Sequence, residues 1–95
     1  MKKGYVYIVS NFTRSTLYTG VTSDLPARIR QHRDGVGSKF ASKYNARCLM
    51  YFEEHENIED AIHRETQIKN WRRQWKIDLI KSINPDLKDL WEELG

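Results

Sequence analysis

Two tyrosines and an arginine near the start of the chain have the types and spacing that phosphodiester chemistry requires. Tyr7 lies in a short apolar run, Tyr18 follows eleven residues later, and Arg28 falls eight residues after Gly20. A phenol in a strand must either pack against its neighbours or use its hydroxyl group. Two phenols and a guanidinium that lie together can orient a water molecule and hold a phosphate. The combination indicates phosphodiester hydrolysis.

A carboxylate provides the second chemical feature of the chain. In the segment 58–71, apolar residues at helical spacing define one face, and Glu65 falls in the middle of that face. A carboxylate within an apolar stripe needs a partner or a cation. Glu65 can hold one divalent ion whose other ligands are water and phosphate. The alternative is an ion pair with Lys69, four residues later in the favourable order, and the two roles are compatible.

A hairpin is expected to position the tyrosines. Residues 5–10 and 17–21 are rich in aromatic and β-branched residues, and the polar segment 11–15 between them is typical of a turn. If the two runs pair in antiparallel fashion about the centre of that loop, Tyr7 and Tyr18 lie directly opposite each other. Cross-strand partners share a face, so both hydroxyls are expected to point the same way.

A helix after the hairpin is expected to bring in further polar groups. Ser23 or Asp24 can cap it, and its periodicity places Arg28 and His32 at the border of the core-facing side. The next elements expected are a basic loop at 39–47 and a third strand at 47–53. Helices are expected at 58–71 and at 74–83, the second with Trp75 and Ile83 facing inward. A short helix is expected after Pro85, with Leu87, Leu90, Trp91 and Leu94 on one face.

These elements predict a single α+β domain with a small three-stranded antiparallel sheet flanked by helices. Ninety-five residues leave room for one core, which we place at about 4–83, with a C-terminal helical extension at 84–95. The one cysteine, Cys48, excludes a disulfide framework and a thiolate zinc site, and its apolar surroundings predict a buried side chain. No window is apolar enough for a signal peptide or a membrane span, so a cytoplasmic protein is expected.

The charge distribution favours a polyanionic partner. The formal net charge is +3, and residues 1–51 contain only two acids, Asp24 and Asp34. An N-terminal half this basic attracts nucleic acid. Phosphate contacts are expected from bases in the loop after the first helix and in a later run that mixes bases with aromatics. The alternative is that these bases are merely solvated. The candidates are Lys39, Lys43, Arg72 and Arg73.

The order Tyr-Val-Tyr, Tyr-Thr-Gly, a helix arginine and a later helix glutamate resembles the GIY-YIG nuclease domain. The resemblance runs from about Gly4 to about Ile83. It looks closest to small stand-alone bacterial members, and more distantly to the nuclease domain of the incision subunit in nucleotide-excision DNA repair. The family implies a three-stranded sheet flanked by helices that cuts DNA with a divalent metal. The residues implied are Tyr7, Tyr18, Arg28, His32 and Glu65 in catalysis, Glu65 as the metal ligand, and Gly20 beside the substrate.

Three positions depart from the pattern of the family. Tyr5 stands where the family name has glycine, Thr19 replaces isoleucine, and Val21 occupies a position that is often basic. None of these changes removes a catalytic group, although losing the base at Val21 is expected to weaken activation of the tyrosine. Many members also have a late asparagine in the site, and Asn70 is the nearest candidate.

The hypothesis is therefore an endonuclease that hydrolyses DNA with one Mg²⁺ or Mn²⁺ ion. Tyr7 is the general base or positions the water, Arg28 stabilises the phosphate and Glu65 holds the metal. His32 supports Tyr7 or passes a proton on. Binding without sequence specificity is expected, because a domain of this size has no separate recognition module. One alternative is a nucleic-acid-binding module with little cleavage that relies on a protein partner for targeting. Another is an interaction domain that uses the terminal leucine stripe.

Overall fold

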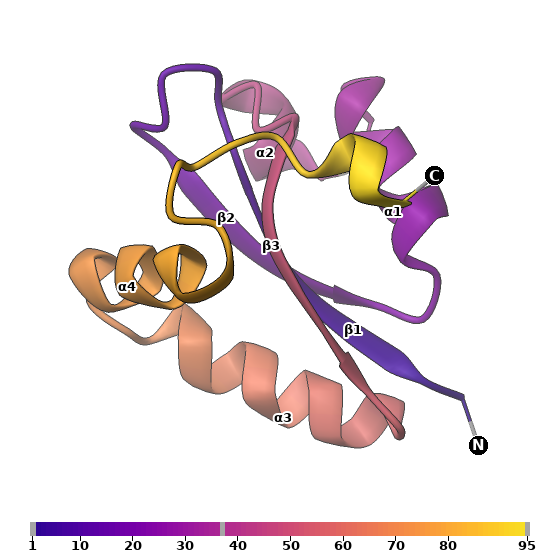
Figure 1. Cartoon of the computed structure of the whole chain (residues 1–95). Helices are drawn as coiled ribbons and strands as arrows, with labels where there is room; N and C mark the ends of the chain where they lie inside the picture. Colours follow the sequence, from indigo (N-terminus) through magenta and orange to yellow (C-terminus); the bar gives the residue numbers. More distant parts are fainter. Residues whose placement is uncertain (1, 37, 95) are drawn as a thin grey trace.

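The fold is built on one antiparallel sheet of three strands, in the order β2-β1-β3 (Figure 1). The computed structural model describes residues 2–36 and 38–94. Strand β1 spans Gly4–Ser10, β2 spans Leu17–Thr22 and β3 spans Cys48–His55. Four α-helices accompany the sheet within the described residues. The predicted α+β class and the three-stranded antiparallel sheet are confirmed.

The central strand β1 is covered on both faces. Val6 and Ile8 point into one core cluster and Tyr7 and Val9 into the other, and all four side chains are fully buried. Successive residues of a strand face opposite sides of its sheet, so burial on both faces explains the nearly continuous apolar run of β1.

Helices from the two halves of the chain cover different faces of the sheet. Helices α3 and α4 cover the Val6 face, whereas α1, α2 and the final turn of the chain cover the Tyr7 face (Figure 1). The helices are α1 at Leu25–Arg33, α2 at Lys39–Lys43, α3 at Ile58–Lys69, α4 at Arg73–Ile83 and a final 3₁₀ turn, η1, at Trp91–Leu94. None of the helices in the described part of the chain has the length and apolarity needed to cross a membrane.

Side-chain caps fix where the two helices of the candidate site begin. The Asp24 carboxylate accepts a hydrogen bond from the Ala27 amide at 3.2 Å, and the Asn57 amide oxygen accepts one from the Glu59 amide at 2.8 Å. Each cap satisfies a backbone N–H that has no partner within its helix. Asp24 rather than Ser23 is therefore the cap of α1, and the predicted cap of α3 is confirmed.

The segment expected as a basic loop contains a short helix, α2. The Ser38 hydroxyl accepts a hydrogen bond from the Ala41 amide at 3.0 Å, which caps the first turn. Ala41 is buried against the sheet in the same cluster as Tyr7. Tertiary burial of one small residue thus orders a turn of helix whose periodicity is too short to detect in the sequence.

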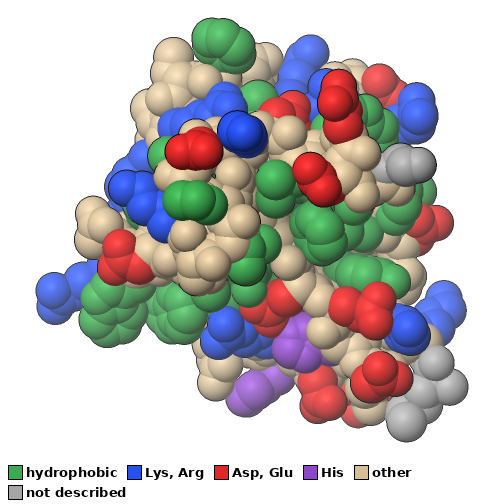
Figure 2. All heavy atoms as spheres, in the orientation of Figure 1, with side chains coloured by type: hydrophobic (Ala, Val, Ile, Leu, Met, Phe, Trp, Pro, Cys, Tyr) green, Lys and Arg blue, Asp and Glu red, His purple; other side chains and the backbone are tan. Residues whose placement is uncertain are grey.

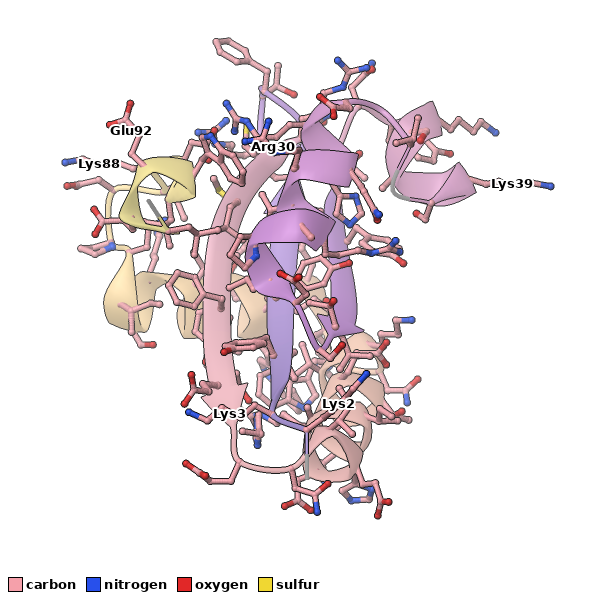
Figure 3. The ribbon with its side chains drawn as sticks, turned by 90° about the vertical axis from the view of Figure 1, so that its right-hand side faces the viewer. Lys2, Lys3, Arg30, Lys39, Lys88 and Glu92 are labelled. Atoms are coloured by element: carbon pink, nitrogen blue, oxygen red, sulfur yellow. The ribbon has the colours of Figure 1, made fainter. Side chains whose placement is uncertain are left out.

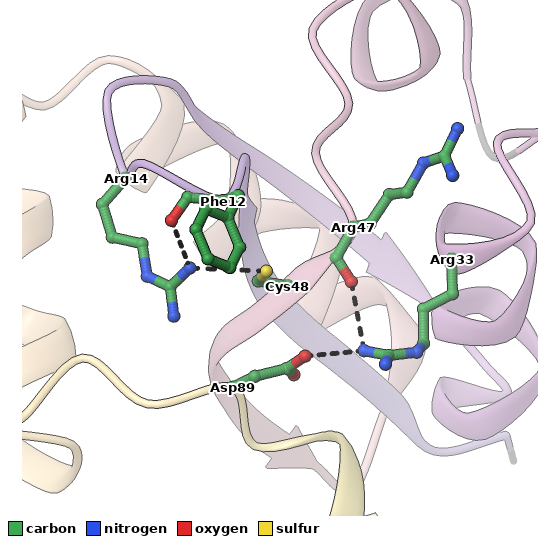
Figure 4. Close-up of a pocket in the computed structure, with 6 residues that line it drawn as sticks. All are labelled: Phe12, Arg14, Arg33, Arg47, Cys48 and Asp89. Carbon is green, nitrogen blue, oxygen red and sulfur yellow. Dashed lines mark hydrogen bonds and ion pairs between the residues drawn. The ribbon is translucent and has the colours of Figure 1, made fainter.

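The C-terminal segment is not the continuous helix expected after Pro85, and only η1 is helical. Asn84 and Asp89 instead tie this segment to backbone groups of β3: Asn84 donates to the Met50 carbonyl at 3.0 Å, and Asp89 accepts from the Leu49 amide at 3.1 Å. Asp89 also pairs with Arg33 at 2.7 Å (Figure 4). The four apolar residues expected on one face therefore divide, with Leu87 against the Val6 cluster and Leu90, Trp91 and Leu94 against the Tyr7 cluster.

Helix α4 buries less of its apolar surface than its sequence predicts. Ile80 is buried, but Trp75 and Ile83, which were expected to face inward, are 53% and 55% exposed. Figure 2 shows apolar side chains at the surface beside α4. Trp75 packs edge-on against Trp71, with 6.3 Å between ring centroids, instead of reaching the sheet. Cys48 is likewise half-buried, because it begins β3 at the rim of the sheet.

Candidate active site

Tyr7 and Gly20 form the floor of the candidate site. They are direct partners across β1 and β2, and Tyr7 is fully buried. A Cβ atom at Gly20 would lie 2.4 Å from both the hydroxyl oxygen and Cζ of Tyr7, so only a hydrogen fits there. The phenol ring thus lies across Gly20. Gly20 therefore permits a close approach of the Tyr7 ring. Its expected place beside the substrate stays a prediction.

Gly20→Ala is expected to destabilise the fold by about 1–3 kcal/mol, the usual cost of overpacking a core. The added methyl group must displace the Tyr7 ring, which is enclosed on all sides. Urea unfolding of Gly20→Ala and the wild type measures the loss. Equal stability of Gly20→Ala and the wild type would show that the Tyr7 ring can move freely.

Tyr18 lies beside Tyr7 and not directly opposite it, so the expected pairing is wrong. Tyr18 pairs with Val9. The hairpin closes between Asn11 and Thr16, where the Asn11 amide donates to the Thr16 carbonyl and the Asn11 side chain accepts from the Thr16 amide at 3.1 Å. This shifts the register by two residues. Because the shift is even, Tyr18 stays on the face of Tyr7, as expected.

Helix α1 supplies two groups that meet the Tyr7 hydroxyl. Arg28 Nε donates to the Tyr7 oxygen at 3.2 Å, and His32 Nε2 lies 2.8 Å from the same oxygen. Residues four apart share a helix face, so one face of α1 presents both groups. The His32 ring also lies against Tyr18, with 5.6 Å between centroids. The structure therefore brings Tyr7, Tyr18, Arg28 and His32 together.

Burial sets the protonation states of this group. It raises the pKa of Tyr7 to about 12, and the hydrogen bond and charge of Arg28 offset only part of that rise. Burial also lowers the pKa of His32 to about 4, and the positive charge of Arg28 acts in the same direction. At neutral pH the free protein therefore holds a neutral phenol against a neutral imidazole.

The lowered pKa of His32 predicts a loss of stability in mild acid. The unfolded chain takes up a proton at His32 near pH 6.5, whereas the folded chain resists protonation until about pH 4. The free energy of unfolding should therefore fall as the pH drops from 6.5 to 4, by up to about 3 kcal/mol. Urea unfolding of the wild type and His32→Gln over this range measures the difference. Parallel pH profiles for the two proteins would contradict the buried neutral histidine.

Glu65 lies on α3, which packs on the Val6 face of the sheet. Its side chain is only 12% exposed, and its Oε2 atom lies 3.1 Å from Lys69 Nζ. The same ammonium lies 5.9 Å from the centre of the Tyr18 ring. The negative charge of Glu65 is one of the influences that raise the pKa of Tyr7. Its charge thus reaches Tyr7, although α3 packs on the opposite face of the sheet. The ion pair considered as the alternative role of Glu65 is formed.

Comparison with known proteins decides the family. The family model of the GIY-YIG catalytic domain matches residues 3–78. The chain belongs to the GIY-YIG family. Members are generally endonucleases, so this is a nuclease-type domain.

Small bacterial proteins share this GIY-YIG domain. A UPF0213 protein of Staphylococcus aureus (strain Mu3 / ATCC 700698) is 38% identical over 81 residues, which cover 85% of this chain and 98% of that protein. A relative in strain Mu50 matches equally well. The solution NMR structure of a UPF0213 protein from Bacillus halodurans is 26% identical, with a TM-score of 0.55 over 92% of each chain. These names state no activity.

GIY-YIG nucleases typically use a divalent metal, and the donors present here fit a hard cation. Glu65 offers carboxylate oxygens, the ligand type that Mg²⁺ and Mn²⁺ prefer. Across residues 2–36 and 38–94, no three His, Cys, Asp or Glu side chains gather into a metal-binding group.

The basic residues expected to contact phosphate lie outside the Tyr7 group. Lys39 and Lys43 are exposed on α2, and Figure 3 shows Lys39 extending into solvent. Arg72 precedes the first residue of α4, and its guanidinium carbon lies 5.8 Å from the centre of the Trp75 ring. Arg73 begins α4 and donates to a backbone carbonyl of the β1–β2 loop. A phosphate contact at any of the four needs DNA that extends beyond the pocket.

The sequence did not predict two contacts of this GIY-YIG site, those of Arg28 with Gln31 and of Lys69 with Tyr18. One predicted site residue, Asn70, lies elsewhere. Arg28 Nη1 donates to Gln31 Oε1 at 2.9 Å, an i, i+3 contact that helical spacing could have revealed. Lys69 was recognised as a partner of Glu65, but its position over Tyr18 depends on how α3 packs against β2. Asn70 donates to the Thr66 carbonyl in its own helix at 3.0 Å, where it ends α3 instead of entering the site.

Proposed function

We propose that this chain is a divalent-metal-dependent endonuclease that hydrolyses phosphodiester bonds of DNA. The observation that carries the proposal is the Tyr7 hydroxyl held between Arg28 Nε and His32 Nε2. A buried phenol could be satisfied by one hydrogen-bonding partner, whereas a second, cationic partner prepares its oxygen to take up negative charge. Neither packing nor simple DNA binding requires that arrangement.

The tautomer of His32 decides what the Tyr7 hydroxyl can do. A neutral imidazole has one N–H, and among the described groups the buried Nδ1 atom has no hydrogen-bond partner. An orphaned N–H is rarer than an unused acceptor, which favours the proton on Nε2. His32 then donates to the Tyr7 oxygen, as Arg28 does. With two donors on its oxygen, Tyr7 directs its own proton toward the substrate.

Tyr7 acts as the general base in this scheme. With a pKa of about 12 it is protonated in the free protein, and more positive charge is needed before its phenolate is populated. The phenolate takes a proton from the attacking water, whose oxygen forms the new bond to phosphorus as the leaving oxygen departs. A divalent ion bound by Glu65 supplies Lewis-acid stabilisation of the phosphate and leaving oxygens.

Arg28 and Tyr18 hold the phosphate. The guanidinium carries five N–H donors, and its contacts with Tyr7 and Gln31 engage two of them. The remaining donors can pair with two phosphate oxygens in a fork. Tyr18, on the same face, donates to a phosphate oxygen or to the water. DNA beyond this point follows Lys39 and Lys43 or Arg72 and Arg73 without sequence specificity.

Tyr7→Phe tests this function because it removes one oxygen and keeps the ring. We expect the single-turnover rate of metal-dependent DNA cleavage to fall about 10²-fold or more. Wild-type rates should rise about tenfold per pH unit above pH 7, since the phenolate fraction does so below its pKa. Tyr7→Phe should lose that slope, while Tyr44→Phe at the end of α2 should behave as the wild type. A loss under threefold, or an unchanged slope, would remove Tyr7 from the chemistry.

One observation favours a second candidate, a nucleic-acid-binding module with little cleavage. In the free protein the Tyr7 phenol is protonated and Glu65 is paired with Lys69, so neither group is ready for catalysis. Such a module could rely on a protein partner for targeting. It would bind DNA in the assay above and release no cleaved product with any metal.

A further inference from the structure

We propose that Lys69 couples metal binding to DNA binding. It holds the Glu65 carboxylate in the free protein and passes to a substrate phosphate when a divalent ion takes the carboxylate. The inference rests on the proposed function, because it takes Glu65 as the metal ligand. It assigns a role to Lys69, which is not among the motif residues named above, and it couples metal binding to DNA binding.

The two members of the ion pair differ in freedom. The Glu65 side chain is 12% exposed, whereas that of Lys69 is 47% exposed, and 3.1 Å separates their charged atoms. A lysine carries its charge on a flexible four-carbon stem with three rotatable donors. The carboxylate is therefore the fixed member of the pair, and the ammonium is the member that can leave.

The ammonium of Lys69 lies beside the reacting groups. It is 5.9 Å from the centre of the Tyr18 ring, and that ring packs against His32, which contacts Tyr7. A divalent ion on Glu65 and the Lys69 ammonium would then be neighbours of like charge, which repel. Metal binding must therefore displace the ammonium. A short swing of its stem can bring it to a phosphate held by Arg28.

Further positive charge surrounds Lys69. Lys76 lies close enough to feel the charges of Lys69 and Arg73. Burial lowers the pKa of Lys76, and the positive charges of Arg73 and Lys69 lower it further. Arg73 is tethered to the Arg14 carbonyl and so keeps its place at the start of α4. Once a metal engages Glu65, this group of cations has lost the carboxylate that neutralised it. A polyanion such as DNA restores the balance.

Metal and DNA should therefore each strengthen the binding of the other. Both ligands draw on the same ion pair, and a coupling of this kind is reciprocal. If the pair only stabilised α3, its i, i+4 geometry would add a few tenths of a kcal/mol to the helix and leave metal affinity unaffected. Metal affinity, measured without catalysis, separates the two roles.

The test begins with Mn²⁺ binding to the full chain by calorimetry, without DNA. Lys69→Met should bind Mn²⁺ about fivefold more tightly than the wild type, because the competing cation is gone. Lys81→Met removes the same charge from the exposed end of α4 and should match the wild type. Glu65→Gln should lose this binding. Circular dichroism confirms that each variant is folded.

The second arm measures DNA affinity in the Tyr7→Phe background, where cleavage does not interfere. With Lys69 present, Mn²⁺ should tighten binding of labelled random-sequence DNA about fivefold relative to chelator. Lys69→Met should lose part of that gain, because the contact of the metal with phosphate remains, and Lys69→Arg should keep all of it. Retention of the full gain by Lys69→Met would overturn the coupling.

The outcomes separate this inference from the proposed function. Equal Mn²⁺ affinity in the wild type and Lys69→Met, with loss only in Glu65→Gln, would overturn the role of Lys69 and leave the metal ligand in place. Equal Mn²⁺ affinity in the wild type and Glu65→Gln would instead overturn the metal role of Glu65 and the inference with it.

Discussion

Glu65→Ala is expected to abolish metal-dependent DNA cleavage while leaving the fold intact. The negative charge of Glu65 acts on Tyr7, and the loss of this carboxylate removes the proposed metal ligand. The fold should survive, because alanine is the strongest helix former and the i, i+4 pair that is lost contributes only a few tenths of a kcal/mol. Cleavage of labelled DNA with Mn²⁺ and thermal unfolding measure the two effects.

The matched control for this substitution is Glu59→Ala. Glu59 is an exposed acid in the first turn of the same helix, and removing it changes the net charge equally. It should leave cleavage within about twofold of the wild type, as expected for a surface substitution away from the site. Cleavage by Glu65→Ala at the wild-type rate would refute the metal role assigned to this residue.

Arg28→Ala should lower the cleavage rate by about 10²-fold or more, the usual loss when one donor to a transition state is removed. Two effects act together. The phosphate loses its guanidinium fork, and Tyr7 loses the hydrogen bond and charge that hold its pKa down. Without Arg28 that pKa rises further, so less phenolate forms at a given pH. Single-turnover kinetics at saturating protein measure the loss.

Arg30→Ala is the control for Arg28. Arg30 lies on the same helix, but its guanidinium lies 5.6 Å from the ring centre of Trp91, toward the C-terminal segment (Figure 3). Its removal costs the same charge without touching Tyr7, so the rate should stay within about threefold. A loss under threefold in Arg28→Ala itself would count against its role.

The elements that carry the site could be predicted because local signals agree there. Strand β1 is marked by its own apolar run. The caps Asp24 and Asn57 each lie directly before the helix that they begin. Arg28 and His32 were placed on one border of α1 by helical spacing alone. Proximity of the Tyr7 hydroxyl to both follows once α1 packs on the Tyr7 face.

Apart from the Arg28–Gln31 contact within α1, the features that sequence reasoning missed depend on contacts between distant or irregular segments. The hairpin register is set at the loop, where the Asn11 side chain accepts from the Thr16 amide and Ser10 pairs with Leu17. The C-terminal path is fixed by Asn84 and Asp89, which bind backbone groups of β3 far earlier in the chain. Side-chain bonds of this kind leave no periodic trace in a sequence.

In the candidate site too, some residues have a local signal in the sequence and others depend on long-range contacts. Glu65 was singled out because a carboxylate breaks an apolar stripe, and that signal is local. The reason for Gly20 lies across the sheet, in the ring of Tyr7 that presses on it. The place of Lys69 over Tyr18 depends on the packing of α3 against β2. These long-range contacts turn a set of motifs into a pocket.

The most direct test of the account is a cleavage assay with the purified full chain. Labelled duplex, single-stranded and branched DNA are incubated with Mg²⁺ or Mn²⁺, and in parallel with chelator. We predict cleavage of at least one of these structures with metal and none with chelator, because the carboxylate and phenols act only around a metal-bound phosphate. Intact DNA in every metal-containing reaction, or equal cutting in chelator, would contradict the account.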